Sequence, residues 1–93
     1  MEKARIVEND KGFKVIEIPR DLLLEKLAIN GSIGICDMCL KSPLTGYYEA
    51  VLNQWLCDDC YKGFIERGVW YKEDEPYELR NFYAFCKLFD VEE

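Results

Sequence analysis

Two pairs of cysteines constrain this chain more than any other feature of its sequence. Each pair has the form Cys-x-x-Cys: Cys36 with Cys39, and Cys57 with Cys60. A gap of two residues lets the backbone curl so that both sulfurs point to one side, and two such pairs supply the four ligands of a tetrahedral ion. Zinc suits four thiolates because it is borderline-soft and redox-inert. The spacing therefore predicts one structural zinc ion, with no coordination position left for water or substrate.

Three other interpretations of these cysteines remain open. The same four ligands suit a rubredoxin-like iron centre. Alternatively, the four cysteines are free buried thiols whose spacing is a coincidence. The stretch from Trp55 to Cys60 has the tryptophan and the Cys-x-x-Cys of a thioredoxin redox motif, although that fold needs a longer βαβ unit and leaves the first pair unexplained. The fifth cysteine, Cys86, falls in an apolar stripe and is predicted to be a core residue.

Charge divides the chain into two parts. The 93 residues have a formal net charge of −6. Residues 1–35 hold as many acids as bases, so residues 36–93 carry the whole excess, and four thiolates with one Zn²⁺ make that part more acidic still. An acidic surface repels a phosphate backbone, which argues against nucleic acid as a partner. The candidates for a basic face all lie in the N-terminal part: Lys3, Arg5, Lys11, Lys14, Arg20 and Lys26.

Length and composition favour one small domain, residues 1–93. Hydrophobic residues make up 49% of the chain, enough for a core, but a domain of this size often needs a metal to stabilise it. The N-terminus has mixed charges with no apolar run behind it, and no stretch approaches membrane-spanning length, so we expect no signal peptide and no membrane partner. Of the 5 cysteines, four sit in metal-type pairs, which predicts a cytoplasmic protein in a reducing compartment.

The predicted fold class is α+β, beginning with a β-hairpin and a helix in residues 1–32. Residues 5–18 contain two β-prone runs separated by a turn at 9–12. Pro19 ends the second run and suits the first turn of a helix, which we expect over 19–29. Its apolar stripe recurs at three-and-four spacing and consists of Leu23, Leu24, Leu27 and Ala28.

Residues 33–68 form the predicted zinc module, in which a hairpin joins the two cysteine pairs. Its strands are expected over 46–52 and 55–57, with a two-residue turn at Asn53-Gln54 and with Tyr48, Ala50 and Leu52 on one face. A helix is expected from Cys57 to Arg67, closed by Gly68, with Asp58 and Asp59 placed favourably against its dipole. Packing beside the metal is expected from four aromatic residues: Tyr47, Tyr48, Trp55 and Phe64.

Residues 69–93 are predicted to end in a helix that starts at Pro76 and runs to about residue 89. Leu79, Phe82, Cys86 and Phe89 recur at three-and-four spacing, and Tyr83 and Phe85 widen this apolar face. Most of the face is expected to enter the core, with the remainder available to a partner.

A cysteine pair, a hairpin and a second pair at a helix N-terminus resemble the layout of treble-clef and LIM-like zinc folds. The spacing, with Leu56-Cys57 leading to Cys60 and Tyr61, is similar to that of the GATA-type finger. The resemblance covers residues 33–68 and implies Cys36, Cys39, Cys57 and Cys60 as ligands. The DNA-reading arginines and basic tail of that family are missing. The chain also resembles, more distantly, small zinc proteins of bacteria and their mobile elements, which implies a cytoplasmic accessory protein.

The sequence favours binding over catalysis. It contains no histidine, the most common general base, and no Gly-rich phosphate loop, so we expect no enzymatic activity. Tyr47, Trp55, Trp70 and Tyr71 cannot all be buried in so small a chain, and large rings beside acidic residues suit a protein partner. We therefore expect a protein-interaction or adaptor module whose contact, with itself or a second protein, centres on Trp70 and Tyr71. The alternative is a nucleic-acid-binding zinc finger that uses the N-terminal bases.

Overall fold

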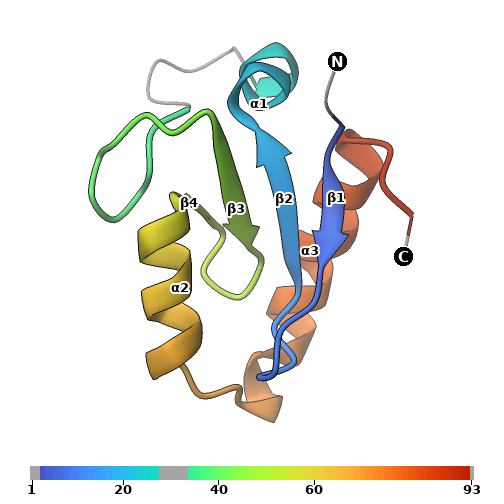
Figure 1. Cartoon of the computed structure of the whole chain (residues 1–93). Helices are drawn as coiled ribbons and strands as arrows, with labels where there is room; N and C mark the ends of the chain where they lie inside the picture. The colour runs from blue at the N-terminus through green and yellow to red at the C-terminus, as the bar shows by residue number, and fades with distance from the viewer. Residues whose placement is uncertain (1–2, 28–33, 93) are drawn as a thin grey trace.

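Two hairpins, distant in sequence, join edge to edge in one antiparallel sheet with the strand order β1-β2-β3-β4. Figure 1 shows the computed structural model, which describes residues 3–27 and 34–92. The predicted first hairpin is present, and Asn9 closes its turn by accepting the backbone N–H groups of Lys11 and Phe13. Its second strand also pairs with the zinc-module hairpin, which places that strand inside the sheet. The strands are β1 (Arg5–Val7), β2 (Val15–Pro19), β3 (Thr45–Glu49) and β4 (Gln54–Leu56).

The strand register separates two layers of side chains. Tyr48 lies opposite Ile16 on one side and Trp55 on the other, whereas its neighbour Tyr47 lies opposite Glu17. Successive residues of a strand point to opposite faces. Tyr48 stacks on Phe85 with ring centroids 3.6 Å apart, and Tyr47 stacks on a ring of the other layer, Tyr61, at 4.3 Å. The sheet is therefore covered on both faces, and each of these two rings comes from a different helix.

Those two helices are α3 (Glu75–Leu88), which carries Phe85, and α2 (Asp58–Arg67), which carries Tyr61. In Figure 1, α2 stands beside β3 and β4, and α3 runs behind β1 and β2. Helix α1 (Arg20–Leu27) follows β2 directly, so Pro19 is the last residue of the strand and not part of the helix, and residues 28–29 of the predicted span lie outside the described residues. A short 3₁₀ turn, η1 (Lys72–Asp74), precedes α3, which has the expected proline in its first turn.

The main core lies between the sheet, α1 and α3. It contains Phe82, Cys86 and Phe89, as the spacing in the C-terminal helix predicts, whereas Leu79 is half-buried outside it and Tyr83 is exposed. Of the stripe predicted for the first helix, Leu23 is buried in this core and Leu27 packs against it. Leu24 is half-buried outside this core, and Ala28 is not described. The remaining buried members are Ile16, Ile18, Tyr48, Ala50 and Trp55.

The second hairpin differs from its predicted form. Strand β3 ends at Glu49, so the prediction of a strand to Leu52 with a two-residue turn is wrong. A longer turn follows, in which Leu52 N–H donates to Glu49 O and Asn53 adopts the left-handed φ of 55° expected of it. The physical reason is that Leu52 leaves the sheet face shared by Tyr48 and packs against the cluster around the cysteines.

Candidate metal centre

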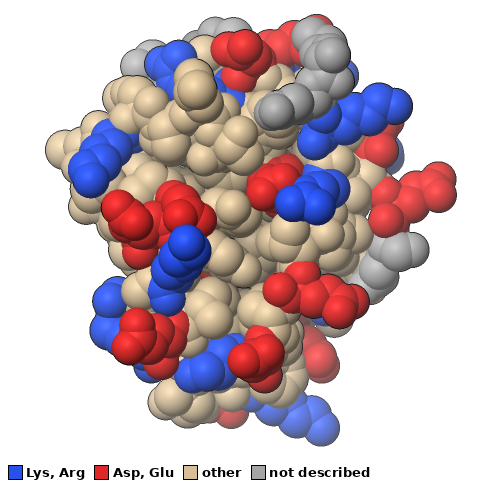
Figure 2. Space-filling view, in the orientation of Figure 1, with Lys and Arg blue, Asp and Glu red and all other residues tan. Residues whose placement is uncertain are grey.

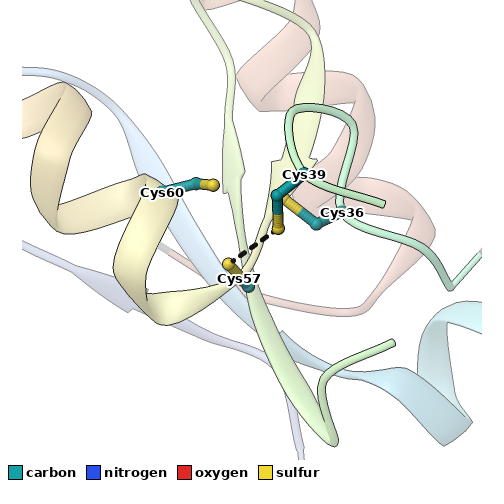
Figure 3. A group of neighbouring side chains, drawn as sticks. All are labelled: Cys36, Cys39, Cys57 and Cys60. Atoms are coloured by element: carbon teal, nitrogen blue, oxygen red, sulfur yellow. Dashed lines mark hydrogen bonds between the residues drawn. The ribbon is translucent and has the colours of Figure 1, made fainter. Parts of the chain in front are cut away.

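Four cysteine sulfurs meet at one end of the sheet, as the sequence predicts. The Sγ atoms of Cys36, Cys39, Cys57 and Cys60 all lie within 4.8 Å of one another, and Figure 3 shows them converging from a loop, a strand end and a helix. A zinc ion with Zn–S bonds of about 2.3 Å places neighbouring sulfurs about 3.8 Å apart. The Sγ atoms of Cys39 and Cys57 are 3.5 Å apart, so the cluster fits one tetrahedral ion.

The first cysteine pair lies in a tight loop between α1 and β3. Cys36 N–H donates to Lys41 O at 2.7 Å, and Leu40 N–H returns to Cys36 O at 2.9 Å. These bonds curl the chain around Cys39 and require a left-handed backbone at Leu40, which has a φ of 67°. That conformation normally favours Gly, Asn or Asp, because a larger side chain clashes with the following carbonyl group.

Asp37 fastens this loop to the strand that leads to the second pair. Its N–H donates to Trp55 O at 3.0 Å, and its carboxylate accepts Trp55 N–H at 2.9 Å. Because Cys57 follows β4 directly, the two bonds hold the loop of the first pair beside the second pair. Sequence reasoning missed this role. The available signal was a carboxylate inside a Cys-x-x-Cys loop, a place where an Asp can accept a backbone N–H.

The second pair is formed by the start of α2. Cys57 is the N-cap residue, with extended backbone angles, and Cys60 lies in the first helical turn. Asp58 and Asp59 occupy that turn, as predicted, and Asp58 pairs with Lys62 at 2.9 Å. The helix end at Gly68 is also as predicted, and its last carbonyl groups meet Lys11 Nζ, which lies 2.9 Å from Gly68 O.

The surroundings of the sulfurs lower the pKa of one thiol and raise the pKa of two others. Burial raises the pKa of the Cys36 thiol, but hydrogen bonds from the backbone amides of Cys39, Cys57 and Met38 outweigh it and bring that pKa to about 6. Burial, followed by the neighbouring thiols, raises the pKa of Cys60 to about 12. Burial raises the pKa of Cys57 as well. A metal ion that binds all four sulfurs must therefore displace protons from the cluster.

Apolar side chains enclose the sulfurs in a small core of their own. Leu56 is fully buried there, and Leu52, Tyr61 and Phe64 pack against it, so the expectation for Phe64 is confirmed. The expectation for Tyr48 and Trp55 is wrong in location, because both belong to the main core on the other face of β3 and β4. Tyr47 lies on the same face of the sheet as the sulfur cluster but contacts it indirectly, because it stacks on Tyr61, which packs against the cluster.

Trp70 and Tyr71, the predicted partner residues, follow the C-terminal end of α2. Trp70 is half-buried, and its Nε1 donates to Glu78 Oε1 at 3.0 Å. Tyr71 is 53% exposed. The structure thus places one ring in a fixed position and leaves the next open to solvent. Cys86 lies in the main core and takes no part in the sulfur cluster.

Two buried carboxylates escaped the sequence reasoning. Glu78 is almost fully buried and accepts both the Trp70 indole N–H and the Lys14 backbone N–H, the latter at 2.9 Å. Glu49 is completely buried, and neither of its oxygens has a hydrogen-bond partner within residues 3–27 and 34–92. Burial, and then the charge of Glu78, raises the pKa of Glu49 to about 8. The carboxyl group of Glu49 is therefore mostly protonated at neutral pH.

In comparisons with known proteins, no family model, curated protein or solved structure shows a significant match to this chain. Of the helices in the described part of the chain, none combines the length and the apolar character of a membrane span. The fold and the sulfur cluster thus define the class of protein: a small α+β domain with a four-cysteine site able to hold one metal ion.

Proposed function

We propose that this chain is a non-catalytic, zinc-stabilised module of the treble-clef kind that acts as a protein-interaction adaptor. Four thiolate ligands leave a zinc ion without an open position for substrate or water, so the metal holds structure. The layout supports the treble-clef type, because the first pair precedes a hairpin and the second pair opens α2. Because the thiols must stay reduced to bind metal, the module suits a reducing compartment such as the cytoplasm.

The observation that carries the interaction role is that the exposed Tyr71 directly follows Trp70, whose ring is held in place. Trp70 is fixed by Glu78, so the adjacent Tyr71 is presented on a support with little freedom to lose on binding. Exposed aromatic rings on rigid supports are the usual anchors of protein contacts. After Lys72, the acidic run Glu73-Asp74-Glu75 follows in the sequence and favours a partner with positive charge.

The alternative of nucleic-acid binding has weaker support, because four of the six N-terminal bases have contacts within the chain, while Lys3 and Lys26 are exposed. Arg5 pairs with Glu17 at 2.6 Å, and Arg20 Nε donates to Gly34 O. Lys11 Nζ contacts the end of α2, and Lys14 Nζ lies over the ring of Phe82. A phosphate backbone would have to compete with these contacts and with the acidic C-terminal part.

The test is to compare Tyr71→Ala with Tyr83→Ala, a matched tyrosine that is 51% exposed on α3. Contacts of the zinc-loaded protein, with itself or with proteins of its native cell, are measured by sedimentation and by quantitative crosslinking. We expect Tyr71→Ala to weaken the contact about tenfold or more while Tyr83→Ala leaves it intact. Trp70 is left unchanged, because removing its indole would leave Glu78 Oε1 unpaired.

A monomer that crosslinks to no partner, or equal loss in both variants, would contradict the proposed contact. Fluorescence anisotropy with labelled DNA and RNA tests the alternative. We expect no binding near physiological salt, and salt-sensitive binding would favour the nucleic-acid role instead.

A further inference from the structure

A second exposed apolar surface lies at the opposite end of α2, on the loop that carries the first cysteine pair. It consists of Met38, Leu40 and Leu44, which are 43%, 75% and 87% exposed. In Figure 1 this loop stands out from the sheet between α1 and β3, and we call these three residues the knuckle patch. Large apolar side chains gathered on one loop, away from any core, are typical of binding sites.

The left-handed backbone at Leu40 is a second unusual feature of the knuckle patch. A leucine with a φ of 67° is strained, and glycine at the same place would relieve the strain. Burial against the described residues does not compensate for it, because three quarters of the side chain faces solvent. The turn around Cys39 needs the left-handed backbone but not a leucine side chain, and strained residues are concentrated at functional sites.

The loop is also held in place before any partner arrives. The bonds between Cys36 and both Lys41 and Leu40 close it, and Asp37 ties it to Trp55 of β4. Leu44 O accepts Arg20 N–H at 2.7 Å, which fixes the far end of the loop at the start of α1. A patch that is already ordered loses little conformational entropy when it is covered.

Charge indicates what covers it. Asp37, Asp58 and Asp59 are exposed around the sulfur cluster, and an open hollow beside the loop is lined by Lys41, Ser42, Pro43, Cys57, Asp58 and Asp59. Four thiolates around one Zn²⁺ add negative charge at the same place. Figure 2 shows a mostly uncharged area with a basic side chain over this loop, and acidic side chains border it over the N-terminal end of α2.

We propose that the knuckle patch docks a segment of another protein that combines apolar side chains with lysine or arginine. The apolar side chains cover Leu40 and its neighbours, and a basic side chain enters the hollow toward Asp59, since Asp58 already pairs with Lys62. A second copy of this chain is a poor occupant, because residues 36–93 carry the whole net charge of −6 and Arg5, Lys11 and Arg20 are engaged internally. The inference rests on the proposed adaptor function and gives it a second surface.

The experiment selects random displayed 12-residue peptides on the zinc-loaded protein. We expect the enriched peptides to contain both apolar and basic residues and to bind more weakly as salt is added. The test variant combines Leu40→Gly, Met38→Ser and Leu44→Ser, and the control is Tyr83→Ala. We expect the triple variant to lose about tenfold or more in affinity and the control to lose nothing.

Folding of the variant is checked by zinc content and thermal unfolding. Leu40→Gly alone relaxes the left-handed backbone, so it is expected to keep its zinc and to unfold at the same or a higher temperature. If the triple variant loses its metal, Leu40→Gly with Leu44→Ser replaces it in the binding measurement.

Enriched peptides without basic residues, peptides that bind the triple variant equally well, or no enrichment at all would overturn the proposal. So would a dimer, or binding to phosphatidylcholine vesicles, that disappears in the triple variant. Peptides that respond to Tyr71→Ala but not to the triple variant would leave the adaptor function standing and remove only the knuckle patch.

Discussion

Glu49 and Glu78 are both buried carboxylates, but their surroundings differ. Glu78 accepts two N–H groups and so links the segment after α2 and the first hairpin to α3 through Trp70 and Lys14. Glu49, on β3, has Glu78 as an acidic neighbour and no hydrogen-bond partner in the described residues. An ionised carboxylate in such a place is costly, so Glu49 is held in its protonated form.

Glu49→Gln is therefore expected to make the protein less sensitive to alkali. The pKa of Glu49 rises from 4.5 to about 8 on folding, so between these values the folded state binds one more proton than the unfolded state. The stability that this proton contributes is complete below pH 4.5 and is lost as pH rises toward 8, at about 1.4 kcal/mol per pH unit. The advantage of the variant over the wild type should grow from pH 6 to pH 8.

Urea unfolding of both zinc-loaded proteins at pH 6, 7 and 8 measures this difference. Metal binding itself depends on pH, but it does so equally in both proteins and cancels from the comparison. Glu66→Gln, at an exposed position on α2, serves as the control and should follow the wild type. A constant offset between Glu49→Gln and the wild type across this range would show that Glu49 does not titrate as proposed.

At the scale of elements, two glycines in the zinc module have opposite roles. A Cβ atom on Gly46 of β3 would clash with the ring of Trp55, which is buried and donates its Nε1–H to Ile18 O. A Cβ atom on Gly63 of α2 would meet only the guanidinium end of Arg67 within 3 Å, which can move aside. The strand needs its glycine for close packing, whereas the helix does not.

We accordingly expect Gly46→Ala to destabilise the protein by about 1–3 kcal/mol, as overpacking of a core does. Gly63→Ala should stabilise it by about 0.5–1 kcal/mol, because alanine restricts the unfolded chain and favours a helix. Chemical unfolding of the two variants beside the wild type provides the measurement. Similar changes in both would mean that Trp55 does not pack against β3 as described.

Most elements of this fold were predictable, because their signals are local. Cysteine spacing, turn residues at 9–12, Gly68 and Pro76 each act within a few positions. The pairing of β2 with β3 was not predictable, since it joins strands separated by α1 and the first cysteine pair and leaves no periodic trace. Glu78 had a usable signal: it stands four residues before Phe82, on the buried stripe of α3.

For the molecule as a whole, the metal is expected to stabilise the layer that contains α2 more than the layer that contains α3. No residue of α2 is fully buried, so this helix is held by the sulfur cluster, two aromatic contacts and Lys11. Helix α3 instead contributes Phe82 and Cys86 to the main core. Removing the metal with a chelator should therefore release α2 and the first cysteine loop and leave the sheet and α3 largely folded.

Hydrogen exchange of the zinc-loaded and chelated protein measures this difference, and elemental analysis should find one zinc per chain. Cys36→Ala should reproduce the chelated state, because three thiolates hold zinc weakly. Cys86→Ala is the control, with full metal content and a loss of about 1 kcal/mol from the main core. Bound iron, loss of metal in Cys86→Ala, or a protected α2 without metal would contradict the assignment.

The shared strand β2 bears on how such a domain is inherited. β2 is bonded to β1 on one edge and to β3 on the other, while Lys11 reaches across to the last carbonyl groups of α2. Small metal-binding domains that fold alone can be duplicated in tandem within one gene. If residues 34–68 were moved alone into another protein, β3 would lack its partner β2 and the end of α2 would lack Lys11. Open strand edges pair with other chains. We therefore expect the four-cysteine segment to fold in a new protein only when the N-terminal hairpin that completes its sheet is moved with it.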